Sequence, residues 1–180
     1  MSDAKISKRY AKALFEFAQE QKSLDTITAD MDYLYQLCDV SDDFVGMLKS
    51  PVIKISKKLE IMVAVFGDKL SETTMRFLNI ISKGRREDII PSMAEQFILM
   101  HNDFIGLKKV KLFTATSLDN ATKNQITKIL GEQTKKTIEL DEEIQEDLIG
   151  GFILKIDDLQ FDASIKSKLN RLKNELSQQY

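Results

Sequence analysis

The residues that most often carry catalysis are few in this sequence and stand far apart. His101 is the only histidine and Cys38 the only cysteine among 180 residues. A histidine base or a cysteine nucleophile needs a partner side chain held beside it, and no motif here supplies one. We therefore interpret His101 as a capping or surface group near a helix end. Cys38 lies on the apolar side of an expected helix, and we interpret it as a small core residue.

Two acidic pairs are the next candidates for chemistry. Glu142-Glu143 and Asp157-Asp158 have the residue types of general acids and bases. Both pairs stand in polar, turn-like sequence, where carboxylates are ordinarily solvated. The chain also lacks a glycine-rich phosphate loop, a nucleophile elbow and paired metal-ligand motifs. The sequence therefore predicts no catalytic residue, no metal site and no cofactor.

Two further pairs have a chemical and a structural interpretation. Gly150-Gly151 opens an expected strand but lacks the spacing of a nucleotide-binding loop, which favours backbone geometry that a side chain would block. Arg85-Arg86 could bind a phosphate. We favour a structural role, because the pair lies between two expected helices and positive charge is favourable near a helix C-terminus.

Composition and charge exclude several classes of function. The chain has 43% hydrophobic and 30% charged residues, with 26 basic and 28 acidic side chains and a net charge of −2. This balance favours neither nucleic acid nor an acidic membrane surface as a partner. No segment reaches the roughly 18 apolar residues of a membrane span. The first residues lack the apolar centre of a secretory signal, so we expect the protein to stay in the compartment where it is made.

Helical periodicity dominates the first 105 residues. Ser41 or Asp42 can cap a short helix that ends before Pro51, and Ser71 caps another that stops at Gly84. Asp88 can cap a helix that continues to Phe104. The expected helices cover residues 5–20, 24–38, the short segment before Pro51, 55–66, 72–83 and about 89–104. Short connections between them predict an antiparallel six-helix bundle.

The pattern changes at Gly106. Residues 109–114 and 137–140 alternate with period two, as half-buried strands do. A helix is expected over about 119–133, and residues 151–162 resemble a hairpin that turns at residues 157–158. Asp162 or Ser164 caps the last helix, whose narrow apolar stripe is Ile165, Leu169, Leu172 and Leu176. The fold class is therefore mainly α, with a six-helix domain over 1–105 and a small α/β domain over 106–180.

Two helices carry more apolar surface than one core face needs. At ~100° per residue, the apolar residues of the first helix cover ~200°, whereas a surface helix needs a stripe of only about 100°. Those of the helix 72–83 cover ~220°. Either both helices lie at the centre of the bundle, or each packs inward with one stripe and holds a partner helix with the other. The apolar residues are Ile6, Tyr10, Ala11, Ala13, Leu14, Phe15, Phe17 and Ala18 in the first helix, and Met75, Phe77, Leu78, Ile80 and Ile81 in the second.

An ordered set of short motifs resembles the ATP synthase delta subunits and the mitochondrial oligomycin-sensitivity-conferring protein. The set spans essentially the whole chain in the family's order. One departure is Ala163, where the family usually has glycine. The motifs are Arg9-Tyr10-Ala11-x-Ala13-Leu14-Phe15-x-x-Ala18, Ser50-Pro51-Val52 with Lys57-Lys58, Phe77-Leu78 with Arg85, Val110-x-Leu112-x-Thr114-Ala115-x-x-Leu118, Leu148-Ile149-Gly150-Gly151, and Asp162-x-Ser164-Ile165-x-x-x-Leu169.

The resemblance implies a non-catalytic stator connector of a rotary proton-translocating ATP synthase. It implies that the first and fifth helices hold the N-terminal helix of an alpha subunit, and that the C-terminal domain meets the b subunits of the peripheral stalk. The protein would then lie on the cytoplasmic face of the bacterial inner membrane, attached only through the complex, and would be a monomer when isolated. The alternatives are a generic helical adaptor and, more remotely, an enzyme with an acid/base site in the C-terminal domain.

Candidate partner-binding residues follow from the two apolar stripes together with the resemblance. On the first helix, we predict that the small-residue stripe Ala11, Phe15 and Ala18 faces the partner, because small side chains let another helix approach closely. The bulkier stripe Tyr10, Leu14 and Phe17 would face the core. On the helix 72–83, Phe77 and Ile81 would face inward, leaving Met75 or Ile80 near the partner. The full candidate set is Tyr10, Ala11, Leu14, Phe15, Ala18, Met75 and Ile80.

Overall fold

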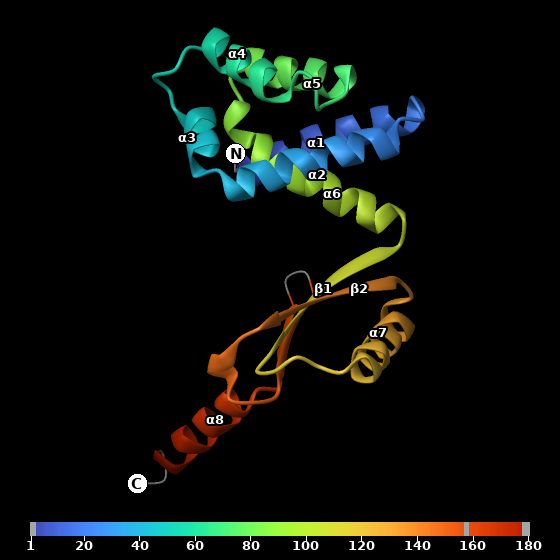
Figure 1. Ribbon diagram of the computed structural model, residues 1–180, viewed down its shortest axis with the longest axis vertical. Coiled ribbons are helices and arrows are strands. Elements are labelled where there is room, and N and C mark those ends of the chain that lie inside the picture. Colours follow the sequence, from blue (N-terminus) through green and yellow to red (C-terminus); the bar gives the residue numbers. More distant parts are fainter. Residues whose placement is uncertain (1–2, 157–158, 178–180) are drawn as a thin grey trace. The chain divides into compact units, whose positions relative to one another are not determined.

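The structure is a computed structural model that describes residues 3–156 and 159–177 (Figure 1). It is mainly helical, with one small four-stranded sheet. The chain forms two compact units, Met1–Asn102 and Asp103–Tyr180, which we call unit 1 and unit 2. The last helix of the helical region ends at Phe104, and the first strand begins at Leu107.

Unit 1 is built from helices around one apolar core. Nineteen buried apolar residues form a single cluster among its described residues. Phe66 lies near its centre, with the ring of Phe44 edge-on at 5.4 Å between centroids. The elements are α1 (Asp3–Glu20), α2 (Leu24–Val40), α3 (Asp42–Lys49), α4 (Ile55–Phe66), α5 (Glu72–Lys83), the short 3₁₀ helix η1 (Glu87–Ile89) and α6 (Ile90–Phe104).

The helix ends follow the local sequence, with one correction. Ser41 caps α3 by accepting the Phe44 amide, and Ser71 caps α5 by accepting the Thr74 amide, each at 3.3 Å. The predicted cap at Asp88 is wrong, because that residue lies inside η1 and α6 begins only at Ile90. A 3₁₀ turn therefore takes the place that a capped first turn would occupy.

Unit 2 places helices around a mixed sheet with strand order β2-β1-β3-β4. Strand β1 (Leu107–Thr114) runs parallel to β2 (Thr137–Ile144), and helix α7 (Asn120–Thr134) connects them. Strand β3 (Phe152–Ile156) pairs antiparallel with both β1 and β4 (Leu159–Asp162). The short 3₁₀ helix η2 (Glu146–Leu148) precedes β3, and α8 (Ile165–Ser177) leads away from the sheet (Figure 1). The hairpin turn predicted at residues 157–158 lies outside the described residues.

The Gly150-Gly151 pair has the steric role that its position indicated. Gly151 has φ +78°, and a Cβ there would lie 2.4 Å from the Ala163 carbonyl oxygen. A Cβ on Gly150 would lie 2.7 Å from the Ile165 side chain. At Gly151 the backbone before β3 therefore approaches the backbone before α8 too closely for a side chain, whereas at Gly150 the Ile165 side chain would have to move.

The first turn of α8 is capped without the glycine that the family usually has at residue 163. Asp162 accepts the Ser164 amide at 2.8 Å, and Ser164 accepts the Ser167 amide at 3.2 Å. Of the two predicted alternatives, Ser164 is therefore the cap of α8, and Asp162 holds the residue before the helix. In the predicted apolar stripe, Ile165 and Leu169 are exposed, while the side chains of Leu172 and Leu176 lie outside the described part of the helix.

Candidate partner-binding face

Helix α1 buries its small residues. Ser7, Ala11, Leu14 and Ala18 are all within 1% of complete burial. The hydroxyls of Ser7 and Ser92 lie 2.6 Å apart, which joins α1 to α6. Ala11 and Ala18 therefore cannot contact a partner, and their assignment to the partner face is wrong. Small side chains do allow a close helix approach, but the approaching helices belong to this chain.

Phe15 lies at the border of the same core face. It is half-buried, and its ring packs edge-on against Phe97 of α6 at 5.6 Å between centroids. Leu14, which the small-residue argument placed in the core, is buried there. The contact with α6 covers part of the Phe15 ring, and a contact of Phe15 with a partner stays a prediction.

The neighbouring part of α1, ~100° around the helix, presents the second apolar stripe. At ~100° per residue, Ile6, Tyr10, Ala13 and Phe17 fall within about 60° of one another. Ala13 is exposed, Ile6 and Tyr10 are half-buried, and Phe17 is 45% exposed. Phe17 was predicted to face the core, and this assignment is also wrong. Since Leu14 and the small residues fill the core side, the bulkier stripe is left toward solvent.

Helix α5 extends this apolar stripe beyond α1. The Tyr10 ring meets the Phe77 ring edge-on, with centroids 6.4 Å apart. Phe77 is half-buried rather than fully inward, and Ile80, ~60° away on the same helix, is 63% exposed. We call this surface the α1–α5 face, and define it by Ile6, Tyr10, Ala13, Phe17, Phe77 and Ile80.

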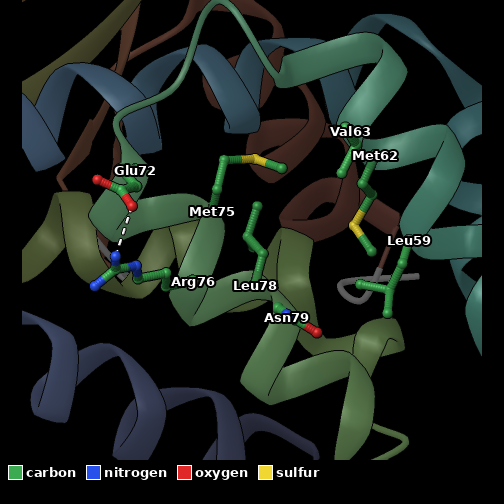
Figure 2. A pocket seen from close by; sticks show the side chains of 8 residues that line it. All are labelled: Leu59, Met62, Val63, Glu72, Met75, Arg76, Leu78 and Asn79. Carbon is green, nitrogen blue, oxygen red and sulfur yellow. Dashed lines mark hydrogen bonds and ion pairs between the residues drawn. The ribbon is translucent and has the colours of Figure 1, made fainter.

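Met75 belongs to a different surface. It lies ~140° from Ile80 around α5 and lines a groove of about 240 Å³ between α4 and α5. Figure 2 shows Met75 and Leu78 of α5 near Met62 of α4, with the ion pair between Arg76 and Glu72 beside them. The choice left open between Met75 and Ile80 is thus resolved: only Ile80 lies on the α1–α5 face.

The start of α5 is fixed by a buried carboxylate from α2. Asp30 accepts hydrogen bonds from the Ser71 amide at 3.0 Å and from the Ser71 and Thr74 hydroxyls at 2.5 and 2.6 Å. Three donors on one buried carboxylate hold the first turn of α5 in a single position. The face that α5 presents is therefore formed before any partner arrives.

The far end of α5 is anchored through a buried ion pair. The Lys58 ammonium of α4 donates to Glu87 of η1 and to the Leu48 carbonyl of α3, both at 2.6 Å. Arg85, with φ 54°, makes the left-handed turn between α5 and η1. The motifs around Pro51 and Arg85, far apart in sequence, thus meet at this pair.

Sequence reasoning missed the role of Lys58, although a signal for it was present. Lys58 stands three residues after Ile55 and four before Met62, on the apolar side of α4. A lysine within a buried stripe is rarely solvated and needs a charged or carbonyl partner. No comparable signal marked Phe17, because the helical wheel shows stripes but not which neighbour covers each one.

Neighbouring charges and burial set the electrostatics of unit 1. The Arg9 guanidinium lies 5.8 Å from the centroid of the Tyr10 ring, so a cation borders the α1–α5 face. Burial raises the pKa of the Cys38 thiol to about 11. The thiol therefore stays protonated at neutral pH, which agrees with its interpretation as a core residue.

The candidate acid in unit 2 has a structural role. Glu142 accepts the Leu118 amide and contacts the Lys123 ammonium, each at 2.8 Å. The hydrogen bond from Lys123, and next that from Leu118, lower the pKa of Glu142. Within residues 3–156 and 159–177 there is no cluster of His, Cys, Asp and Glu placed to hold a metal ion. No helix in those ranges is long and apolar enough to span a membrane.

Unit 1 carries an exposed apolar face, and a second compact unit follows it along the chain. The family model described as ATP synthase delta (OSCP) subunit matches residues 6–176. The chain belongs to this family, as the ordered motifs indicated.

Relatives agree with this membership, and a solved structure shares the fold. "ATP synthase subunit delta" of Cytophaga hutchinsonii is 32% identical over 179 residues, covering 99% of this chain and 98% of the relative. The protein of the same name from Christiangramia forsetii is 34% identical, over 98% and 95% of the two chains. A chain in the cryo-EM structure of the Toxoplasma gondii mitochondrial ATP synthase hexamer has the same fold, with a TM-score of 0.70 at 18% identity over 94% and 96% of the chains.

Proposed function

We propose that this chain is the non-catalytic stator connector of a rotary proton-translocating ATP synthase. Unit 1 binds the N-terminal helix of an alpha subunit, and unit 2 binds the b subunits of the peripheral stalk. The observation that carries the proposal is the α1–α5 face, an apolar surface on two fixed helices in a member of the delta family. The protein then lies on the cytoplasmic face of the bacterial inner membrane, held there by the complex.

The mechanism is mechanical. Rotor torque would turn the catalytic head unless a connector joined the head to the fixed stalk. The connector must hold both partners at once and for long times, which requires slow dissociation. Nanomolar affinity corresponds to about 12 kcal/mol. Burying several large apolar side chains at ~1.5–3 kcal/mol each can supply that order of free energy before association costs.

The α1–α5 face suits a helix as its occupant. Its residues recur along α1 at positions 6, 10, 13 and 17, so the apolar stripe runs parallel to the helix axis over about three turns. An amphipathic partner helix with apolar residues at i, i+3, i+4 and i+7 fits such a stripe. Arg9 at its border favours a partner that carries an acidic side chain beside its own stripe.

Binding of an alpha-subunit peptide to single variants tests the face. We expect Phe17→Ala and Ile80→Ala each to weaken binding by at least fivefold in calorimetry, with little change in melting temperature, because both side chains are exposed. Met75→Ala is the control on the same helix, and Leu99→Ala, at 46% exposed on α6, matches Phe17. Equal affinity in all four variants would exclude the α1–α5 face as the binding site of the alpha-subunit peptide.

We assign the two binding activities to residues 1–105 and 106–180. The helical region ends at Phe104 and has its own core, which supports independent folding of the first fragment. Deleting residues 107–180 should preserve binding of the alpha peptide and abolish binding of b. Loss of both activities in a folded fragment would contradict this division.

Simultaneous binding separates a stator connector from a generic helical adaptor. A tagged chain should recover alpha and b subunits together, and should co-purify with the catalytic head from native membranes. Recovery of one partner only, with the other excluded, would favour the generic adaptor. The purified chain alone should be a monomer without ATP hydrolysis.

A further inference from the structure

One face of the sheet in unit 2 is apolar across all four strands, but its exposure rises from one side to the other. Val110 and Leu112 on β1 are 0% exposed, and Leu154 on β3 is 8% exposed. On β4, Phe161 is 62% and Leu159 is 77% exposed. Phe161 pairs with Leu154, and Leu159 pairs with Ile156, so all these side chains share one face.

Helix α7 packs on the β1–β2 half of this face, and the cluster that it joins extends to Leu154 of β3. Its Ile126 and Leu130 lie in this cluster with Val110 and Ile138. On one flank of Ile126, Lys123 reaches Glu142 of β2 at 2.8 Å. Ile129 lies ~60° to the other flank and is 55% exposed. Since the Lys123 flank faces β2, the apolar flank of α7 faces the other side of the sheet, where β3 is partly buried and β4 is exposed.

The width of the sheet indicates how many helices can pack side by side on this face. Strands lie ~4.8 Å apart, so four strands span ~19 Å. A helix with its side chains is ~10 Å wide, so the face has room for two helices side by side. Helix α7 fills one position, and α8 leads away from the sheet (Figure 1). The described residues of unit 2 place no second helix there.

We propose that one amphipathic helix of a partner chain occupies this vacant position, beside α7 and over Phe152, Ile156, Leu159 and Phe161. The identity of that partner as a b subunit of the stalk rests on the function proposed above. Five residues of β3 extend over ~17 Å, which a helix of about 11 residues, or three turns, covers. The bound segment should therefore offer apolar residues at i, i+3, i+4 and i+7 toward the sheet.

The size of the surface favours a single helix over a second copy of this chain. Two largely exposed side chains, Leu159 and Phe161, and two half-buried ones, Phe152 and Ile156, form a patch of roughly a few hundred Å². A stable dimer of standard size needs about 800 Å² from each partner. One helix that also contacts the Ile129 flank of α7 fits the smaller patch.

Binding of the isolated C-terminal region of b to the full chain tests the position of the helix. We expect Phe161→Ser and Leu159→Ser each to weaken binding at least tenfold in calorimetry. The matched control is Gln160→Ser, since residue 160 is exposed on the same strand but points to the opposite face. Leu159→Ser keeps the test valid if Phe161→Ser disturbs folding, because Leu159 lies outside the ring contact between Phe152 and Phe161.

Several outcomes separate this inference from the proposed function. If both variants bind b normally while deletion of residues 107–180 abolishes binding, the inference is wrong and the stator function stands. If the intact chain does not bind b at all, the assignment of unit 2 to the stalk fails first. A dimer in sedimentation that Phe161→Ser dissociates would show a second copy as the occupant. That result overturns the inference.

Discussion

Unit 1 has a closed core and unit 2 has a half-covered one. In unit 1, nineteen buried apolar residues from every α-helix form a single cluster, while the corresponding cluster of unit 2 has four. Unit 1 keeps its spare apolar surface outside a complete core, on the α1–α5 face. Unit 2 exposes a continuation of the core itself. The first unit therefore resembles a rigid receptor, and the second a layer that a partner completes.

The two units should differ in stability. A unit that closes its own core buries its apolar surface whether or not a partner is present. A unit that lacks part of a layer gains that burial only on binding. We therefore expect unit 1 to be the more stable of the two in the isolated chain, and unit 2 to gain more from its partner.

The largest effect should come from breaking the buried ion pair of unit 1. Lys58→Ala leaves the Glu87 carboxylate buried without its cation, and removing one member of such a pair costs ~3–5 kcal/mol. A urea melt measures the loss. The control is Lys57→Ala, whose exposed pair with Glu60 should contribute less than ~1 kcal/mol. Equal effects of the two substitutions would show that the pair does not hold α4 to η1.

A matched pair of leucine truncations compares the two cores directly. Leu14 of unit 1 is fully enclosed, whereas Leu154 of unit 2 borders the bare strand β4. Leu14→Ala should cost ~3–5 kcal/mol, because a closed core cannot fill the cavity, and Leu154→Ala about 2 kcal/mol. Denaturant melts of both variants check this. A larger loss at Leu154 would contradict the idea that the layer of unit 2 is half open.

Glycine substitutions sharpen the comparison at the level of the backbone. Gly151→Ala in unit 2 forces a side chain against the Ala163 carbonyl at φ +78° and should cost ~1–3 kcal/mol. Gly46→Ala in α3 of unit 1 meets nothing within 4 Å and should stabilise by ~0.5–1 kcal/mol. Thermal melts show whether each substitution stabilises or destabilises the fold. Stabilisation by Gly151→Ala would mean that β3 and α8 move apart freely.

Sequence patterns predict the elements of this fold because the signals for them are local. Ser41 and Ser71 cap helices within three residues of themselves, and the alternation around Val110 marks a strand without reference to any partner. The predicted cap at Asp88 was wrong because a 3₁₀ turn and a capped first turn begin with the same residue types. Local chemistry thus fixes where elements begin and end to within a turn.

The partner face was less predictable because it depends on packing between distant elements. A wheel of α1 shows two stripes, but α2 and α6 decide which of them is covered. The core side holds Ser7 with its hydroxyl 2.6 Å from that of Ser92, and nothing near residue 7 indicates that partner. Phe17 therefore appeared to be a core residue, and Ala11 a contact residue.

The smallest expected effect is the loss of stability of unit 2 at low pH. Among the described residues, the carboxyl groups with a lowered pKa all lie in unit 2, namely Asp103, Asp119, Glu142 and Asp162. For Glu142, the hydrogen bond from Lys123 and then that from Leu118 favour the charged form and hold the pKa below the ordinary value of 4.5. A carboxyl with a depressed folded pKa stabilises the fold fully above its unfolded pKa, and this contribution is lost as the pH falls through the folded pKa. Unit 2 should therefore lose stability below about pH 4.5.

The variant Glu142→Gln tests this acid response. It removes the titrating group, so the urea midpoint of unit 2 should be lower than that of the parent at pH 7 and should fall less between pH 5 and pH 3. Methyl NMR signals of Ile126 and Ile138 follow unit 2, while those of Ile27 and Ile81 follow unit 1 in the same sample. Parallel acid curves for parent and variant would show that the contact between Glu142 and Lys123 does not stabilise the attachment of α7 to β2. The part of the layer that α7 covers would then depend on apolar packing alone.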